Sequence, residues 1–176
     1  MLDATAALIL ERGAVNFTVE AVVERTGIAL TTIYRHWRTR NDLLAAGIAH
    51  LSDPIPYPDS GSTRTDLVSF FAGRMELLHW DEKLRTLPGI IEAGRTDGKI
   101  ATVVTQFVTG LHKTVQIMLV RGQERGDVRR DRDVSAMADV LLGAIILRRG
   151  YRGEQISKAH VAAIMDTIME GIGVRE

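Results

Sequence analysis

The sequence of 176 residues predicts an all-α protein, and three observations lead to this fold class. Apolar residues recur at spacings of three and four along most of the chain, which is the period of one helix face. No long window alternates polar and apolar residues, as a half-buried strand would. Glycines and capping residues stand at the ends of the periodic segments. Apolar residues make up 45% and charged residues 25%, so the composition is that of a folded chain and not of a disordered one.

The first two helices are delimited by a threonine and two glycines. A helix over residues 2–12 ends at Gly13, because glycine accepts a positive φ at little cost. Thr18 is a suitable N-cap for a second helix, since its hydroxyl can accept a hydrogen bond from the first turn. Gly27 closes this second helix and provides the turn that leads into the next one.

A third short helix spans about residues 29–36, and a fourth follows directly. The sequence Thr39-Arg-Asn-Asp42 forms a capping box, in which the threonine and the aspartate can each bond a backbone N–H at the helix start. The fourth helix continues to Leu51. Together these segments predict a compact N-terminal group of helices.

A proline-rich segment over residues 52–62 separates two domains in this interpretation. It holds three of the four prolines at alternate positions, which forbid a helix and favour an extended chain. We therefore expect one domain over residues 1–51, a linker over 52–62 and a second domain over 63–176. A surface loop inside a single domain is the alternative.

The second domain is predicted to begin with a helix and a broken helical stretch. A second capping box, Thr63-Arg-Thr-Asp66, opens a helix that runs to about Trp80. The stretch over 84–95 is helical but interrupted at Pro88-Gly89, because proline removes a backbone donor and clashes with the preceding turn. The longest helix follows over about 98–124.

Two apolar helices close the chain, over about 134–149 and 157–172, with Asp133 and Ser157 as caps. Their apolar faces are wide enough to pack on more than one partner. An intramolecular core is one interpretation, and half of a four-helix dimer interface is the one we favour. The candidate interface residues are Met137, Leu141, Ile145, Val161, Ile164, Met165 and Ile168.

Composition excludes several classes of protein. The chain has no cysteine, so a disulfide scaffold, a thiolate zinc site and a cysteine nucleophile are excluded. The start lacks the basic region of a signal peptide, and the longest apolar run, Val140–Leu147, is too short to span a membrane. We expect a cytoplasmic protein without a membrane partner. Because the net charge is +0, any grip on DNA must come from a local arrangement, such as the three arginines within Arg35–Arg40.

The third helix carries the side chains that point to a function. On a helix, Ile33 faces inward, and hydroxyl and basic residues project outward. The hydroxyls of Thr32 and Tyr34 can donate to phosphate oxygens, and Arg35 can reach a phosphate or the O6/N7 edge of guanine. The methyl of Thr31 can meet a thymine methyl, as can the side chain of Leu30, while Thr18 offers a hydroxyl and backbone N–H groups to another phosphate. This layout is typical of a helix-turn-helix that reads DNA.

Residues 1–51 resemble the N-terminal DNA-binding domain of the TetR family of bacterial regulators. The matching residues are Leu2-Asp-Ala, Glu11-Arg-Gly13, Thr18, Val22, Thr26-Gly-Ile28, Thr32-Ile-Tyr-Arg-His-Trp37 and Arg40-Asn-Asp-Leu-Leu44. The second half is similar to the family in organisation only. The resemblance implies an all-helical homodimer, in which a three-helix DNA-binding domain precedes a helical domain that binds a small effector and dimerises through its last two helices.

Carried over residue by residue, the resemblance assigns Thr18, Thr32, Tyr34 and His36 to phosphates and Thr31 and Arg35 to bases. Arg40 stands where the family usually has a lysine that meets the DNA backbone. Two positions depart from the family pattern: Ala29 replaces a capping serine, and Leu30 replaces a polar or basic residue. The predicted DNA-binding set is Thr18, Leu30, Thr31, Thr32, Tyr34, Arg35, His36 and Arg40.

An effector pocket is expected in the second domain on the same grounds. Its candidate lining is Phe70, Phe71, Met75, Leu78, His79, Ile90, Phe107, Leu111 and Met118. This lining is largely apolar and implies a small apolar effector of unknown identity. For each residue alone, an ordinary core position is the alternative.

Nothing in the sequence indicates an enzyme. No Ser/His/Asp set, HExxH sequence or glycine-rich phosphate loop occurs, and the histidines are scattered without the spacing of metal ligands. We therefore expect no metal and no cofactor.

The sequence as a whole predicts a dimeric, sequence-specific transcriptional regulator. Its partner is expected to be double-stranded DNA with a palindromic operator, from which an effector releases it as a repressor. The alternative is a helical ligand-binding or adaptor protein that has lost DNA binding. Ala29, Leu30 and the lack of a basic extension before the first helix favour that alternative.

Overall fold

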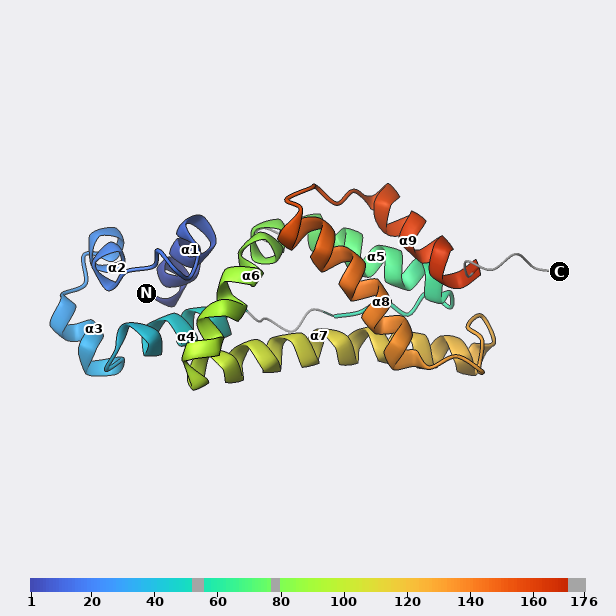
Figure 1. The fold of residues 1–176 in the computed structure, drawn as a ribbon, viewed down its shortest axis with the longest axis horizontal. Coiled ribbons are helices and arrows are strands. Elements are labelled where there is room, and N and C mark those ends of the chain that lie inside the picture. The colour runs from blue at the N-terminus through green and yellow to red at the C-terminus, as the bar shows by residue number, and fades with distance from the viewer. Residues whose placement is uncertain (52–55, 77–79, 171–176) are drawn as a thin grey trace. The chain divides into compact units, whose positions relative to one another are not determined.

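The computed structural model describes residues 1–51, 56–76 and 80–170, and within these ranges it is helical without a strand (Figure 1). The helices are α1 (Leu2–Arg12), α2 (Val19–Thr26), α3 (Leu30–His36), α4 (Arg40–His50), α5 (Thr63–Glu76), α6 (Trp80–Thr96), α7 (Gly98–Arg125), α8 (Val134–Ile146) and α9 (Lys158–Glu170). A π-helical segment, Leu147–Tyr151, continues α8. The predicted all-α fold class is confirmed. None of the helices in the described ranges is both long and apolar enough to cross a membrane.

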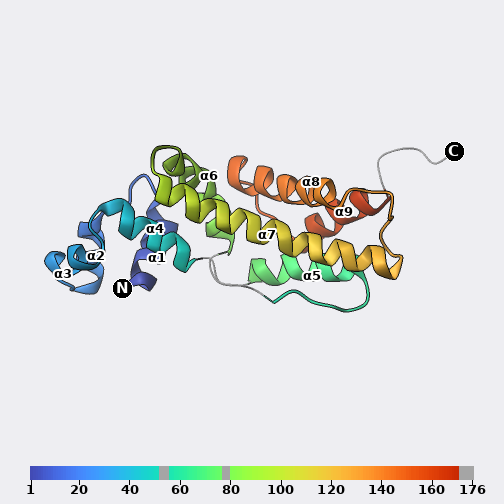
Figure 2. The ribbon, with the colours of Figure 1, turned by 90° about the horizontal axis from the view of Figure 1, so that it is seen from below.

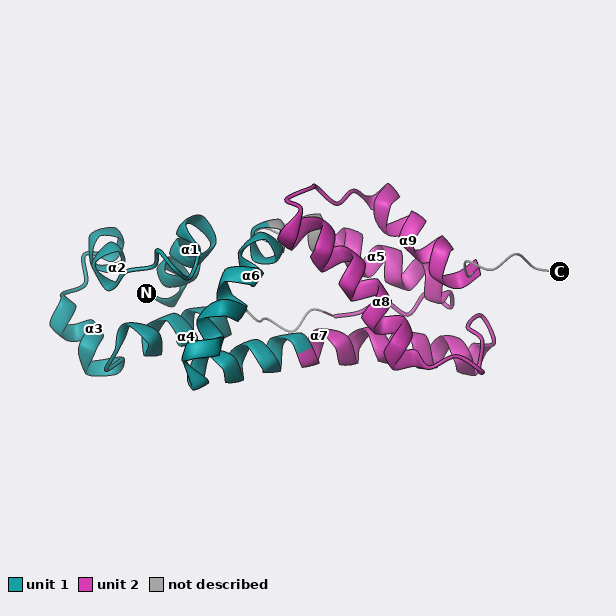
Figure 3. Ribbon diagram, viewed as in Figure 1, with its two compact units in different colours: residues 1–54, 82–108 teal, residues 55–81, 109–176 magenta. Residues whose placement is uncertain are grey.

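The chain divides into two compact units (Figure 3). Unit 1 comprises Met1–Pro54 and Glu82–Val108, and unit 2 comprises Ile55–Asp81 and Thr109–Glu176. Contacts therefore group α6 and the first part of α7 with the N-terminal helices, whereas the sequence interpretation assigned them to the second domain. This grouping places four helices of the first 51 residues and the α6–α7 connection in one packed body.

In unit 1, α1 packs against α4 and α2, and α2 packs against α3 (Figure 2). Its core holds one or more fully buried side chains from each of these helices, together with Ile90 of α6 and Ile100 of α7. The helices begin and end as expected: Thr18 Oγ1 accepts from the Ala21 N–H at 3.2 Å, and Gly27 has φ 68° after α2. The capping box at the start of α4 is also present.

Unit 2 contains α5, α8, α9 and the second part of α7, with α9 packed against both α5 and α8. The predicted caps of the last two helices are confirmed. Asp133 accepts from the Ala136 N–H at 2.9 Å, and Ser157 Oγ accepts from the His160 N–H at 3.2 Å. Gly126, with φ 90°, follows the end of α7 as expected.

The predicted capping box at the start of α5 is wrong by one residue. Ser62 is the capping residue, because its Oγ accepts from the Thr65 N–H at 3.3 Å. Thr63 instead turns to the far end of α7, where its N–H and hydroxyl both donate to the carboxylate of Asp127, at 2.6 and 2.9 Å. A partner 64 residues away thus decides the position of the helix start.

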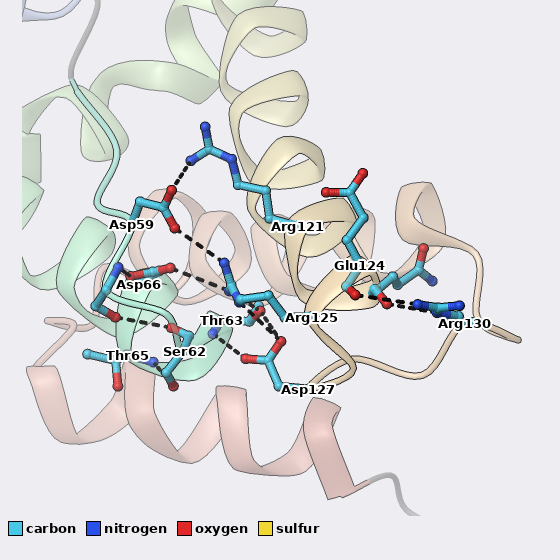
Figure 4. Close-up of polar contacts among 12 residues, drawn as sticks. Asp59, Ser62, Thr63, Thr65, Asp66, Arg121, Glu124, Arg125, Asp127 and Arg130 are labelled. Atoms are coloured by element: carbon cyan, nitrogen blue, oxygen red, sulfur yellow. Dashed lines mark hydrogen bonds and ion pairs between the residues drawn. The ribbon is translucent and has the colours of Figure 1, made fainter.

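Arg125 lies at the centre of the polar cluster that ties α5 to the end of α7 (Figure 4). Its guanidinium is 3.3 Å from Asp59 and 3.0 Å from the Thr63 hydroxyl, and it is 3.7 Å from Asp66. The Asp66 side chain is almost fully buried, and the Ser60 N–H donates to it at 2.7 Å. A buried carboxylate needs such partners, because burial without them costs several kcal/mol, about as much as a domain's whole margin of stability.

The predicted interruption at Pro88-Gly89 is also wrong, because α6 runs through both residues. Proline removes one N–H and one helix bond at about 3 kcal/mol. Leu84, Leu87 and Ile90 stay buried along one face of α6. Their packing fixes the helix across the proline, as tertiary contacts commonly override local propensity.

Gly122 provides a test of the close approach between α7, the start of α5 and the segment after α7. A Cβ added there would overlap the Thr63 hydroxyl and the Val128 side chain. We expect Gly122→Ala to lower the free energy of unfolding by about 1–3 kcal/mol, as overpacking does. Gly110→Ala is the matched control, since it lies on the same helix with nothing within 4 Å of an added Cβ. It should raise stability by about 0.5–1 kcal/mol through helix propensity. Urea unfolding measures both, and equal stability of the two variants would contradict the close approach.

Candidate nucleic-acid interface

The segment from α2 to α3 forms a helix-turn-helix (Figure 1). Gly27 closes α2 in the left-handed conformation, and its N–H donates to the Val23 carbonyl at 2.8 Å. The next N–H, of Ile28, donates to Thr26 Oγ1 at 3.3 Å. These two bonds fix a three-residue turn, so that α3 leaves α2 in a defined direction.

Ile33 within α3 and Trp37 directly after it attach this helix to the core. Ile33 is 0% exposed, and Trp37, at the C-terminal end of the helix, is half-buried against the same core. Ala29 precedes α3 and provides no side-chain cap. The orientation of α3 therefore depends on Ile33, Trp37 and the glycine turn and not on its own capping.

The opposite face of α3 carries most of the predicted DNA-binding residues. Leu30 is 39% and Tyr34 is 40% exposed, values that are high for large side chains on a packed helix. Thr31, Arg35 and His36 are also exposed, and Thr32 is half-buried. The outward direction expected from the sequence is thus what the structure has.

The polar side chains of this face make no hydrogen bond or ion pair within the described part of the chain. This holds for the side chains of Thr31, Thr32, Tyr34 and Arg35. By contrast, Arg25 of α2 makes two bonds of 2.8 and 2.7 Å to Glu11. The α3 side chains are therefore available to an external partner.

Three acidic side chains of unit 1 have partners that lower their pKa. The amide of Asn41 and the backbone N–H groups at the start of α7 lower the pKa of Asp97. The Lys99 ammonium lowers the pKa of Asp42 in the same way, and His50 lowers the pKa of Asp3. Each of these acids has its own basic or amide partner within unit 1.

Thr18 is exposed at the N-terminus of α2, where it caps the helix. Its oxygen accepts the Ala21 N–H, so its hydroxyl proton remains to donate outward.

Arg40 differs from the other predicted DNA-binding residues, because it is half-buried and its guanidinium is occupied. It donates to the carbonyls of Phe17, Ala14 and Val15 at 2.8, 2.6 and 3.2 Å. Sequence reasoning missed this role, since nothing local in the sequence shows that the loop between α1 and α2 folds over the start of α4.

A small apolar cavity of about 30 Å³ lies within unit 1. It is lined by Ile48, Leu51, Lys83, Leu87, Ile90, Val104 and Phe107. Among the predicted effector residues that the structure describes, Ile90 and Phe107 line it. Phe70, Phe71, Leu111 and Met118 are instead buried in unit 2. Leu78 and His79 lie outside the described residues, as does the side chain of Met75.

The last helices present a different surface from the one predicted. Leu141, Ile145, Val161 and Met165 are at most 2% exposed inside unit 2, so they form its core. Met137, Ile164 and Ile168 are half-buried. The large hydrophobic side chains exposed on this segment are Val140, Leu147 and Tyr151, at 60%, 56% and 66%. A groove of about 310 Å³ runs between α8 and α9, lined by Val140, Ala144, Arg148, His160, Ala163, Ile164, Thr167 and Ile168.

Two family models match the chain. Residues 1–46 match the bacterial regulatory proteins of the tetR family, and residues 57–168 match the tetracyclin repressor-like C-terminal domain. The second match alone covers more than half of the chain. The chain belongs to the TetR family. It is therefore a transcriptional regulator of a DNA-binding family, and that family is not one of enzymes.

Relatives of this TetR-family protein extend over nearly its whole length. The HTH-type transcriptional regulator YdeS of Bacillus subtilis strain 168 is 25% identical over 174 residues, which are 98% of this chain and 87% of YdeS. The TetR-family regulator SCO0332 is 28% identical in sequence, and its crystal structure superposes on this one with a TM-score of 0.71. The match covers 98% of this chain and 96% of SCO0332. A TetR-family regulator from Rhodococcus has the same fold, with a TM-score of 0.76 at 19% identity over 96% of each chain.

Proposed function

We propose that this TetR-family protein is a homodimeric repressor that binds a palindromic DNA operator and is released by a small apolar effector. The observation that supports it best is the outer face of α3, where exposed hydroxyl and guanidinium groups have no partner among the described residues. Acting on the chromosome, such a protein works in the cytoplasm.

The proposed contacts follow from the chemistry of each side chain. The hydroxyls of Thr32 and Tyr34 donate to phosphate oxygens, as does the Thr18 hydroxyl at the start of α2. Arg35 bonds the O6/N7 edge of a guanine or a phosphate. Around them, Thr31 and Leu30 meet thymine methyl groups, and His36 lies at the phosphate backbone.

Dimerisation supplies the second recognition helix. A palindromic operator needs two copies of α3 about 34–36 Å apart, one turn of the duplex. The exposed Val140 and Leu147 of the α8 segment, with the adjoining α8–α9 groove, form an apolar surface that suits a second copy of the same chain.

The cavity in unit 1 suits an effector site that acts on α4. Small-molecule sites usually measure about 300–1,000 Å³, so a cavity of about 30 Å³ holds such a ligand only after α4 separates from α6 and α7. A ligand that binds this open arrangement better than the closed one shifts the population towards it. Because α4 belongs to the same unit as α3, the shift reaches the DNA-reading helix.

The DNA proposal is tested with Arg35→Ala and Tyr34→Phe. We expect Arg35→Ala to weaken operator binding about 10- to 100-fold, the value of one good base or phosphate contact, and Tyr34→Phe to weaken it about 10-fold. Arg95→Ala is the control, since this exposed arginine lies on α6 beside Glu92. Mobility shift on the DNA upstream of the coding region measures all three. Unchanged affinity in both α3 variants would favour the adaptor alternative.

The dimer proposal is tested with Val140→Glu. A carboxylate on an apolar interface is desolvated without a partner, so we expect the variant to be monomeric at micromolar concentration. Val120→Glu changes another exposed valine, 39% exposed on α7, and should leave the dimer intact. Light scattering after size-exclusion chromatography gives the masses, and a dimeric Val140→Glu would refute this surface.

The effector proposal is tested with Val104→Phe, which adds a ring at the cavity lining. We expect this variant to bind the operator and to stay bound in the presence of compounds that release the wild type. Thr105→Phe puts the same ring on the exposed side of α7 and should still be released. If such compounds release Val104→Phe equally well, the effector binds elsewhere.

A further inference from the structure

Arg40 is the first residue of α4, and its guanidinium is directed at the loop between α1 and α2. Nε donates to the Phe17 carbonyl at 2.8 Å. Nη2 donates to the carbonyls of Ala14 and Val15 at 2.6 and 3.2 Å, and Nη1 donates to Asn41 Oδ1 at 3.0 Å. Arginine has five N–H donors, and these bonds use four of them inside the chain.

The loop needs these donors. Ala14 and Phe17 are each 1% exposed, whereas Val15 between them is 73% exposed. The bonds from Arg40 to the carbonyls of Ala14 and Phe17 are partly buried, and a buried carbonyl without a partner is costly. The guanidinium also lies 5.7 Å from the centre of the Phe17 ring, which adds a cation–π contact. These contacts offset the unfavourable placement of a cation at the N-terminus of α4, where the helix dipole repels positive charge.

The residue after Phe17 is Thr18, which caps α2 and is one of the groups assigned to a phosphate above. A displacement of the loop therefore moves Thr18 and the first turn of α2. Through the turn at Gly27, the same displacement reaches α3.

We propose that Arg40 is a positioning residue for DNA binding: it holds the α1–α2 loop, and with it Thr18, in the geometry that fits the duplex, and it makes no phosphate contact itself. This proposal rests on the DNA-binding function proposed above. A lysine is not equivalent at this position, because its ammonium is a single point of charge and cannot bond three carbonyls in the planar fork of a guanidinium.

The two roles predict different dependences of DNA affinity on salt concentration. Each phosphate neutralised by a cation contributes about 0.9 to the slope of log affinity against log salt concentration. A positioning residue lowers affinity without lowering this slope. If the arginine contacts a phosphate, replacing it with a neutral residue reduces the magnitude of the slope by about that amount, and a lysine in its place restores the slope.

The experiment compares Arg40→Lys, Arg40→Gln and Arg38→Gln in the full chain. Anisotropy of a labelled operator duplex at several salt concentrations gives affinity and slope, and hydrogen–deuterium exchange follows the amides of the loop and of Ala21. We expect both Arg40 variants to bind at least about 10-fold more weakly with the wild-type slope, and to exchange faster in the loop. Arg38 is exposed and without a partner in the described chain, so Arg38→Gln should leave the exchange unchanged.

Wild-type affinity in Arg40→Lys, together with a slope reduced by about 0.9 in Arg40→Gln, would overturn the proposal and assign Arg40 to a phosphate. If Arg40→Gln does not fold, Arg40→Lys alone decides between the two roles. If the wild type binds no operator, the proposed function fails. The exchange measurement still decides whether Arg40 holds the loop, and unchanged exchange in Arg40→Lys would then refute it.

Discussion

Unit 1 depends on a hydrogen bond between the first turns of two helices. The Asn41 amide of α4 donates to the Asp97 carboxylate at 2.9 Å, and the same carboxylate caps α7 through the N–H groups of Lys99 and Ile100, at 2.9 and 3.2 Å. The Asp42–Lys99 ion pair lies beside it. Asn41 also accepts from Arg40, so one side chain connects the cap of α7 to the residue that holds the α1–α2 loop. Rotation of α4 away from α7 has to break this set of bonds. Together with Ile90 and Ile100, which lie in the core of unit 1, these bonds keep the α6–α7 connection against the N-terminal helices.

Local features of the fold were predictable from the sequence because their causes are local. The caps at Thr18, Thr39 and Asp133 bond N–H groups three residues away, and Gly27 is required by a positive φ within its own turn. The inward position of Ile33 follows from the period of a helix that has one apolar residue to bury.

Other features depend on partners far along the chain and have no local signature. Ser62 caps α5 because Thr63 is taken by Asp127, and Pro88 stays helical because its neighbours are buried. The same holds for Arg40, whose acceptors lie 23 to 26 residues earlier. The proposed dimer surface illustrates the limit of periodicity. Regular apolar spacing on α8 identified residues of the internal core, whereas the exposed Val140 and Leu147 lie off that stripe.

The weakness of α3 explains why the surroundings of the helix-turn-helix matter. α3 has seven residues and no side-chain cap, and isolated helices below about 12–15 residues are marginal in water. A missing cap costs about a further 1 kcal/mol. The helix is therefore held by Ile33, by Trp37 and by the turn from α2, and the position of α2 depends in turn on the loop that precedes it. In such an arrangement a residue that never meets DNA can set the affinity for it, because the energy of recognition includes the cost of keeping a short, uncapped helix in place.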